Sequence, residues 1–339
     1  MRILVVGAGS WGTTLACLLA RKNYIVTLWA RDQILAQRMQ ILRYNPRYQS
    51  EAFLPPNLVA TSDLSQAAAH ENDVAVFAVP SHAMRTTVQK VRSRLNPDTL
   101  VISVAKGIEE KTFKRMSEVL AEELSSAYRK NIAVLSGPNH AEEVSREIPT
   151  ATVISAFDKK VAKKLQDIFM TPCFRVYTNP DMIGVELAGA VKNIIAIAAG
   201  ISDGLGFGDN TKASLITRGL AEMTRFGVAL GAKAPTFSGL AGMGDLIVTC
   251  ISRYSRNRAV GEKLGRGEKL EDILKETSMV AEGIRTSRAV YELANNHRVP
   301  MPITKNVTEV LYEGKNPRES VKELMTREAT EEIEEIVLP

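Results

Sequence analysis

The chain opens with Arg2-Ile-Leu-Val-Val-Gly7-Ala-Gly9-Ser-Trp-Gly12, a short apolar β-branched run that leads directly into Gly-x-Gly-x-x-Gly. A helical pattern of apolar residues follows from Thr14 to Leu19. In such a unit the first glycine permits a tight turn, the second lets a pyrophosphate approach the backbone, and the third lets helix and strand pack closely. The amino end of the helix offers unpaired N–H groups to the anion. This context favours dinucleotide binding over a purely structural glycine turn.

The first half of the chain alternates strand-like and helix-like segments. Such alternation predicts βαβ units and a doubly wound Rossmann-type α/β domain, which we place at residues 1–180. Amphipathic helical patterns lie near 32–43, 81–95 and 111–129. The apolar runs expected as buried parallel strands are Ile3–Val6, Tyr24–Trp29, Val74–Val79, Leu100–Val104 and Ile132–Leu135, with Thr150–Ile154 and Phe174–Tyr177 as two further candidates.

After about residue 180 the strand patterns fade and long helical patterns replace them. We therefore expect an all-α substrate and catalytic domain over residues 181–339. Its apolar helix faces suggest a homodimer. The expected helices cover 183–201, 212–230, 256–264, 282–296 and 303–313.

Composition narrows the class of protein. The chain has 339 residues, 45% hydrophobic and 24% charged, and a net charge of +5 with Lys and Arg dispersed along it. Nucleic-acid binding usually requires a basic stripe or patch, so we do not expect it here. Cys17, Cys173 and Cys250 are odd in number and far apart, which favours reduced thiols in the cytoplasm and argues against disulfides or a metal site. The apolar stretch 183–201 contains Glu186 and Lys192, so we expect no membrane span.

The end of the second predicted strand bears on the choice of cofactor. NAD-selective folds place an acidic residue there to bind the ribose 2′-hydroxyl. Here the strand ends in Ala30-Arg31-Asp32. Arg31 suits a 2′-phosphate, whereas Asp32 can simply cap the next helix. We therefore favour NADP(H), with NAD(H) as the alternative.

Later motifs make the prediction more specific. In order along the chain they are Ser103-Val-Ala-Lys106-Gly-Ile-Glu109, Leu135-Ser-Gly137-Pro-Asn139-His-Ala141-Glu-Glu, Gly189-Ala-Val-Lys192-Asn193, Gly239-Leu-Ala-Gly-Met-Gly-Asp245-Leu, Ser255-Arg256-Asn257-Arg258 and Val280-Ala-Glu282-Gly283. Together, from residue 1 to about 327, they resemble the bacterial type of NAD(P)-dependent glycerol-3-phosphate dehydrogenase. That resemblance implies reversible reduction of dihydroxyacetone phosphate, a small phosphorylated substrate, to sn-glycerol 3-phosphate for glycerophospholipid synthesis.

The resemblance also implies catalytic roles. A ketone reduced by hydride needs a proton from a positioned acid, and Lys192 resembles the acid/base lysine of the family. Partial burial in its Ala- and Gly-rich helix would lower the pKa of Lys192 towards the working range. Asp245 resembles the residue that contacts the substrate hydroxyl and orients the lysine; from the sequence alone it reads as a helix cap. His140 is a competing proton donor, which we rank below Lys192.

The remaining predicted contacts form two sets. Arg256 and Asn257 are expected to clamp the substrate phosphate, and Asn139 stands where the family usually has Ser or Thr. The expected substrate-binding residues are Lys106, Gly137, Asn139, Asn193, Thr249, Ser255, Arg256 and Asn257. The expected cofactor-binding residues are Gly7, Gly9, Ser10, Trp11, Gly12, Arg31, Lys106, Ala141, Arg256, Val280 and Glu282.

Two other functions remain open from the sequence. One is another hydroxyacid or sugar-acid phosphate dehydrogenase of the same two-domain class, which should lack the Ser-Arg-Asn-Arg clamp. The other is a dinucleotide-binding protein that no longer catalyses a reaction. The presence of Lys192, Asp245 and Arg256 together disfavours the second.

Overall fold

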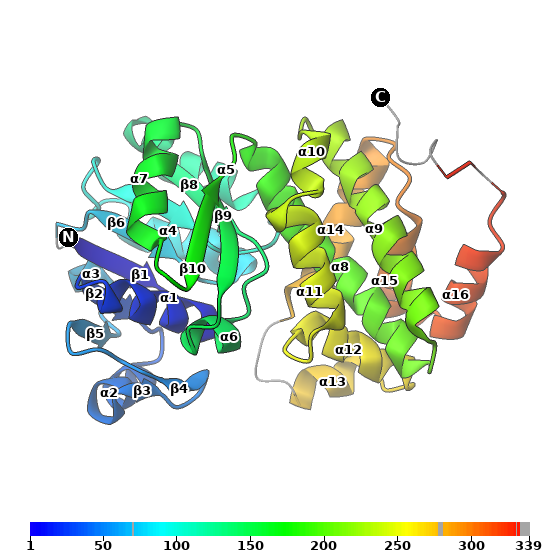
Figure 1. Ribbon diagram of the computed structural model, residues 1–339, viewed down its shortest axis with the longest axis horizontal. Coiled ribbons are helices and arrows are strands. Elements are labelled where there is room, and N and C mark those ends of the chain that lie inside the picture. Colours follow the sequence, from blue (N-terminus) through cyan, green and yellow to red (C-terminus); the bar gives the residue numbers. More distant parts are fainter. Residues whose placement is uncertain (70, 277–280, 330, 333–339) are drawn as a thin grey trace. The chain divides into compact units, whose positions relative to one another are not determined.

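The protein is described by a computed structural model that covers residues 1–69, 71–276, 281–329 and 331–332. It has two compact units (Figure 1). The first contains Met1–Ala105 and Met116–Met182, and the second contains Lys106–Arg115 and Ile183–Pro339. The main division falls between Met182 and Ile183. The segment Lys106–Arg115 differs from the prediction, because it groups with the helical unit although it lies within the α/β part of the sequence.

The first unit is built on an eight-stranded sheet with the order β10-β9-β8-β7-β6-β1-β2-β5. All its neighbouring strands pair in parallel except β8 and β9, which are antiparallel. The strands are β1 (Arg2–Val6), β2 (Ile25–Trp29), β5 (Leu58–Thr61), β6 (Val74–Phe77), β7 (Leu100–Ser103), β8 (Ile132–Ser136), β9 (Thr150–Ala156) and β10 (Phe174–Thr178). The predicted doubly wound fold is confirmed, and β9 and β10 extend it in the reversed direction.

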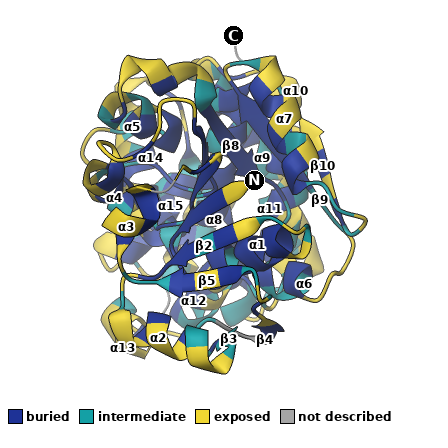
Figure 2. Cartoon of the chain, turned by 90° about the vertical axis from the view of Figure 1, so that its left-hand side faces the viewer, coloured by how far each residue is buried: buried dark blue, intermediate teal, exposed yellow. Residues whose placement is uncertain are grey.

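The helices of the first unit cover both faces of this sheet. In β1, Ile3 and Val5 belong to one buried cluster and Leu4 and Val6 to another, as expected when successive side chains point to opposite faces. In Figure 2 the outer sides of α2 and α3 are exposed. The helices are α1 (Ser10–Arg21), α2 (Gln33–Leu42), α3 (Leu64–Ala69), α4 (Met84–Val91), α5 (Met116–Glu123), α6 (Ala141–Ser145) and α7 (Lys159–Phe169).

Three local expectations need correction. The edge strand β5 was not predicted, nor was the antiparallel pair β3 (Tyr44–Asn45) and β4 (Gln49–Phe53). The helix expected over 111–129 is shorter, because residues before Met116 form a hairpin in which Ile108 bridges Arg115.

Apart from the hairpin at Lys106–Arg115, the regular elements among the second unit's described residues are helices, as predicted. Its long helix α8 (Met182–Gly204) is buried at every position from Leu187 to Ser202. A helix that is apolar on all sides is stable only inside a core. Around it lie α9 (Asp209–Ala229), α10 (Ala234–Phe237), a π-helical turn (Leu240–Gly244), α11 (Asp245–Ile251), α12 (Arg256–Gly265), α13 (Leu270–Glu276), α14 (Glu282–Asn296), α15 (Pro302–Tyr312) and α16 (Pro317–Met325).

Two segments are long and apolar enough to cross a membrane by length and composition alone. They are Met182–Gly204, with 89% of its apolar window buried inside the protein, and Ala234–Ile251, with 44% buried. The first is the core helix α8, and the second is divided among α10, the π-helical turn and α11. Neither is a clear membrane span.

Candidate active site

The glycine loop between β1 and α1 has the geometry of a dinucleotide fingerprint. Gly7 has φ +118°, and a Cβ at this position would lie 2.6 Å from the carbonyl oxygen of Ala78. A Cβ at Gly12 would lie 1.9 Å from the carbonyl oxygen of Gly7, whereas a Cβ at Gly9 would meet no atom within 4 Å. Gly7 therefore permits the tight turn, and Gly12 permits the close packing of α1 against that turn. Gly9, the cap of α1, leaves open space where a pyrophosphate can approach the helix N-terminus.

A side chain that the sequence analysis missed supports this loop from behind. The amide of Asn45 is fully buried and donates to the Ala8 carbonyl at 2.9 Å and to the Thr13 hydroxyl at 2.8 Å. Its Oδ1 accepts from the backbone N–H of Tyr48, and the Ser10 hydroxyl donates to the Tyr48 carbonyl at 2.9 Å. The predicted cofactor residue Ser10 is thus tied to the segment that follows α2. The Asn-Pro pair at 45–46 is a turn signal that could have indicated this position.

Two further predicted cofactor residues lie beside the loop. Trp11 is partly buried and packs against Phe174, with ring centroids 6.3 Å apart. Ala141 is the first residue of α6, and its carbonyl accepts from the Thr14 hydroxyl at 3.3 Å. Trp11, in the first turn of α1, and Ala141, which contacts α1, therefore both lie close to the glycine loop.

The end of β2 separates the roles of its two charged residues. Asp32 caps α2, accepting from the backbone N–H of Leu35 at 3.1 Å, and its second oxygen pairs with Arg47 at 3.2 Å. The backbone hydrogen bonds from Leu35 and then Ile34, followed by the charge of Arg47, lower the pKa of the Asp32 carboxyl. Arg31 is exposed. The capping alternative considered for Asp32 is therefore observed.

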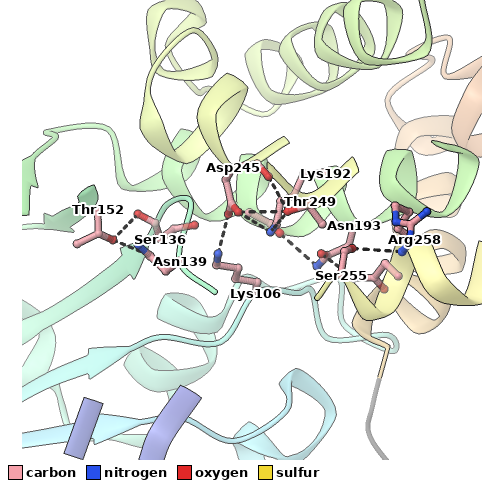
Figure 3. A network of polar contacts seen from close by, with 12 residues as sticks. Lys106, Ser136, Asn139, Thr152, Lys192, Asn193, Asp245, Thr249, Ser255 and Arg258 are labelled. Carbon is pink, nitrogen blue, oxygen red and sulfur yellow. Dashed lines mark hydrogen bonds and ion pairs between the residues drawn. The ribbon is translucent and has the colours of Figure 1, made fainter. Parts of the chain in front are cut away.

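The turn after β8 ties Asn139 to the neighbouring strand. Gly137 has φ +150°, and a Cβ there would lie 3.0 Å from the Cα of Thr152. The Asn139 amide donates to the Ala151 carbonyl at 3.2 Å, and its Oδ1 lies 2.9 Å from the Thr152 hydroxyl (Figure 3). Asn139 thus braces the turn against β9. His140 occupies the cap position of α6.

The second unit contains a buried cluster of charged side chains around Asp245. Lys192 on α8 places Nζ 2.6 Å from Oδ1 of Asp245 and 2.7 Å from the hydroxyl of Thr249. Lys106 places Nζ 2.6 Å from Oδ2 of the same carboxylate. The carboxylate therefore accepts hydrogen bonds from two ammonium groups, one on each oxygen (Figure 3). The predicted residues Lys106, Lys192, Asp245 and Thr249 are brought together.

Helix geometry explains how Asp245 and Thr249 act jointly. Asp245 is the first residue of α11, and Thr249 lies four residues later on the same face. The Thr249 hydroxyl donates to the Asp245 carbonyl at 2.5 Å while accepting from Lys192. The π-helical turn just before Asp245 is of a kind found frequently at functional sites. The helix-cap alternative for Asp245 does not hold, because its carboxylate binds the two lysines instead.

The surroundings of Lys192 shift its proton affinity. Burial lowers the pKa of its ammonium and the Asp245 charge raises it, while Lys106 lowers it further; the result is about 8. Burial by itself raises the pKa of the Asp245 carboxyl, but Lys106 and Lys192 together bring it below its ordinary value. At neutral pH the cluster therefore contains a carboxylate and a lysine that releases its proton more readily than usual.

A chain of amides continues from this cluster. Asn193, next to Lys192, accepts at Oδ1 from the Asn257 amide at 2.9 Å. Asn257 Oδ1 in turn accepts from the backbone N–H of Gly283 at 2.9 Å. The predicted substrate residues Asn193 and Asn257 are therefore joined to each other and to the start of α14.

The other predicted phosphate-clamp residues lie at the first turn of α12. Ser255 is buried and caps this helix, accepting from the backbone N–H of Arg258 at 3.2 Å. Arg256 is its first residue and is exposed. Glu282 begins α14 and is half-buried. Val280, also predicted to bind the cofactor, lies outside the described residues.

Four glycines set the distance between α8 and α12. A Cβ at Gly200 would lie 2.0 Å from the Arg258 carbonyl oxygen, and one at Gly261 would lie 2.0 Å from the Ile197 carbonyl oxygen. Gly204 and Gly265, one turn further along each helix, show the same crowding against the opposite backbone. The two helices are therefore in backbone contact, which brings Asn257 within hydrogen-bonding distance of Asn193.

The sequences of both units match known protein domains. Residues 2–162 match the N-terminal domain of NAD-dependent glycerol-3-phosphate dehydrogenases, and residues 181–322 match the C-terminal domain. The chain belongs to the NAD-dependent glycerol-3-phosphate dehydrogenase family. A relative named glycerol-3-phosphate dehydrogenase [NAD(P)+] from Chlorobium limicola is 54% identical over 98% of this chain and 100% of its own length. The relative of the same name from Moorella thermoacetica is 52% identical over 98% of each chain.

Solved structures of this family have the same fold. Glycerol-3-phosphate dehydrogenase from Coxiella burnetii is 39% identical with a TM-score of 0.91, covering 96% of this chain and 99% of its own. The Saccharomyces cerevisiae enzyme is 28% identical with a TM-score of 0.80, covering 95% and 98%. D-mandelate dehydrogenase, 14% identical with a TM-score of 0.61 over 95% of this chain and 100% of its own, shares the fold alone. The predicted family and the prediction of an NAD(P)-dependent dehydrogenase are confirmed.

Proposed function

We propose that the chain catalyses the reversible reduction of dihydroxyacetone phosphate to sn-glycerol 3-phosphate, with Lys192 as the acid and base. The observation behind this proposal is the contact of the buried Lys192 ammonium with Asp245 and Thr249, in a chain of this family. The nicotinamide cofactor supplies the hydride when it is bound. The former carbonyl oxygen then needs a proton, and a lysine with a pKa of about 8 can supply one near neutral pH.

In this proposal Asp245 orients the Lys192 ammonium and keeps its pKa above the value that burial alone would give. Thr249 and Asn193 add polar contacts beside it. Arg256 and Asn257 bind the substrate phosphate at the amino end of α12, where the helix dipole favours an anion. Ser255 acts through this helix by capping it.

We propose that the cofactor lies along the glycine loop of the first unit, with Ser10, Trp11 and Ala141 beside it. NADP(H) is the favoured form. The Asp32 carboxylate is engaged by its helix cap and by Arg47, while Arg31 offers an exposed guanidinium next to it in the sequence. A guanidinium can bind a 2′-phosphate through two parallel hydrogen bonds.

The variant Arg31→Gln tests this preference. We expect its kcat/KM with NADPH to fall by roughly ten- to a hundredfold, the range for loss of a charged hydrogen bond, with little change for NADH. Arg38→Gln, an exposed arginine on α2, is the matched control and should change neither value. If the ratio of the two efficiencies stays the same in Arg31→Gln, Arg31 does not read the 2′-phosphate.

The biological setting is also part of the proposal. Cys17, Cys173 and Cys250 are all free thiols, which fits a reducing cytoplasm. Supply of sn-glycerol 3-phosphate for glycerophospholipids would follow from the proposed reaction. Met243, Ile247 and Ile251 leave an exposed apolar line along one helical face, a feature compatible with a homodimer. Light scattering on the purified protein would give its oligomeric state.

A further inference from the structure

Lys106 reaches Asp245 from a hairpin that is separated in sequence from the rest of the helical unit. The Lys106 hairpin, residues Lys106–Arg115, follows β7 and precedes α5, yet it groups with the second unit. Its turn is closed by backbone hydrogen bonds from Glu109 to the Lys114 carbonyl and from Phe113 to the Glu109 carbonyl, both at 2.9 Å. The chain leaves the first unit at Ala105 and re-enters it at Met116. Its contacts with the helices place it in the second unit.

Two contacts attach the hairpin firmly to the buried part of the second unit. Ile108 is 1% exposed and belongs to the hydrophobic core that contains α8. Arg115 pairs with Glu186 on α8 at 2.6 Å, and their side chains are only 14% and 7% exposed. Glu186 lies on the same helix as Lys192, so this ion pair joins the far end of the hairpin to the helix of the proposed proton donor.

A second ion pair on the hairpin is different in character. Arg285 and Glu110 are 3.4 Å apart, with side chains 49% and 44% exposed. Water screens exposed ion pairs of this kind, so they contribute little to the stability of a conformation. Breaking a buried pair is strongly destabilising, so such a pair favours the conformation in which both partners meet. The two pairs therefore provide a natural contrast on a single hairpin.

We infer that the Arg115–Glu186 ion pair positions Lys106 against Asp245 and thereby sets the charge around Lys192. Arg115 and Glu186 are positioning residues in this account, since they act through Lys106. The inference rests on the role of Lys192 proposed above. It adds an ion pair, remote from Lys192, that influences the protonation of Lys192.

The consequence for Lys192 follows from the groups that face it. Asp245 and Thr249 of α11 contact it, Lys106 of the hairpin shares its carboxylate partner, and the Cys250 thiol lies nearby with its pKa raised by burial to about 12. Lys106 lowers the pKa of Lys192 by like-charge repulsion and by its side-chain contact. If the hairpin loosens, this opposition weakens and Asp245 holds the Lys192 proton more strongly. The pKa of Lys192 then rises.

The test compares Arg115→Gln, Arg115→Lys and the control Arg285→Gln, each assayed for kcat against pH in both reaction directions. In Arg115→Gln we expect the alkaline limb of ketone reduction, and the acid limb of alcohol oxidation, to move to higher pH by up to about one unit. Arg115→Lys keeps the charge, so its pH limbs should lie close to those of the unmodified protein. Arg285→Gln should show no shift. A fall in kcat with unmoved limbs would overturn the inference, because a general folding defect scales the rate at every pH.

A second readout does not depend on activity. Brief acylation of the folded proteins, followed by mass spectrometry, measures the reactivity of Lys106 and Lys192, whose side chains are 19% and 6% exposed. We expect Lys106 to react faster in Arg115→Gln while Lys192 stays protected. Unchanged labelling of Lys106 would overturn the inference even if the proposed function is right. Faster labelling of Lys106 in Arg115→Gln without a shift of the pH limbs would overturn the inferred effect of the ion pair on Lys192. Glu186→Gln provides the same comparison from the other partner if Arg115→Gln does not fold.

Discussion

Lys192 and Asp245 form an ion pair 2.6 Å long whose side chains are only 6% and 2% exposed. Burial of an ammonium is costly unless a charge compensates it, and here a single carboxylate compensates two lysines. The arrangement leaves Lys192 with a pKa of about 8, so its two protonation states are close in free energy near neutral pH. That balance is what a residue needs to give a proton in one direction of a reaction and take it in the other.

Asp245→Asn removes the charge that raises the pKa of Lys192 and leaves burial and Lys106, which both lower it. We expect the pKa of Lys192 to fall below about 8. Since ketone reduction needs the protonated lysine, its alkaline limb should move to lower pH, and kcat at pH 7 should fall. The pH profile of kcat measures both effects. A limb that moves to higher pH would show that Asp245 does not stabilise the Lys192 ammonium.

Gly9→Ala and Gly12→Ala separate cofactor binding from folding. A Cβ at Gly12 would come within 1.9 Å of the Gly7 carbonyl oxygen, so Gly12→Ala should lower the thermal midpoint as well as activity. A Cβ at Gly9 meets no protein atom, so Gly9→Ala should keep its thermal midpoint and lose affinity for the dinucleotide. Calorimetry and fluorescence titration measure the two quantities. Normal dinucleotide affinity in Gly9→Ala would contradict the proposed position of the pyrophosphate.

Gly261→Ala tests the contact between α8 and α12. The added methyl would lie 2.0 Å from the Ile197 carbonyl oxygen, and relieving such an overlap within a packed core costs about 1–3 kcal/mol. We expect the free energy of unfolding to fall by that amount. Gly208→Ala is the control, because a Cβ there meets nothing within 4 Å and Gly208 has φ −88°. Equal stabilities in chemical denaturation would show that the helices can move apart without cost.

The sequence allowed much of the fold to be predicted, because its signals were local. The apolar runs, the glycine fingerprint and the change to helical periodicity each lie within a short window. These local signals did not predict the features in which contacts between distant segments decide how strands or segments pair. The short strand β5 follows two prolines, and β9 pairs antiparallel to β8 after a connection that contains α6. The hairpin at Lys106–Arg115 joins the helical unit through Arg115 and Glu186, a contact with no local signature.

The candidate site shows the same division. Lys192, Asp245 and Lys106 were singled out by family resemblance and Thr249 by its four-residue spacing from Asp245, and the structure brings them into one cluster. Asn45 was missed because it acts through hydrogen bonds to residues more than 30 positions away. The capping role of Ser255 was also missed, since its motif suggested a ligand contact.

The central claim is that Lys192 transfers the proton, and Lys192→Met tests it most directly. Methionine has a similar length and no titratable group. The account predicts that kcat for NADPH-dependent reduction of dihydroxyacetone phosphate falls by about 10²- to 10⁴-fold, with the pH dependence near 8 abolished and NADPH affinity retained. A Lys192→Met enzyme with a kcat close to that of the unmodified protein, and the same pH profile, would contradict it.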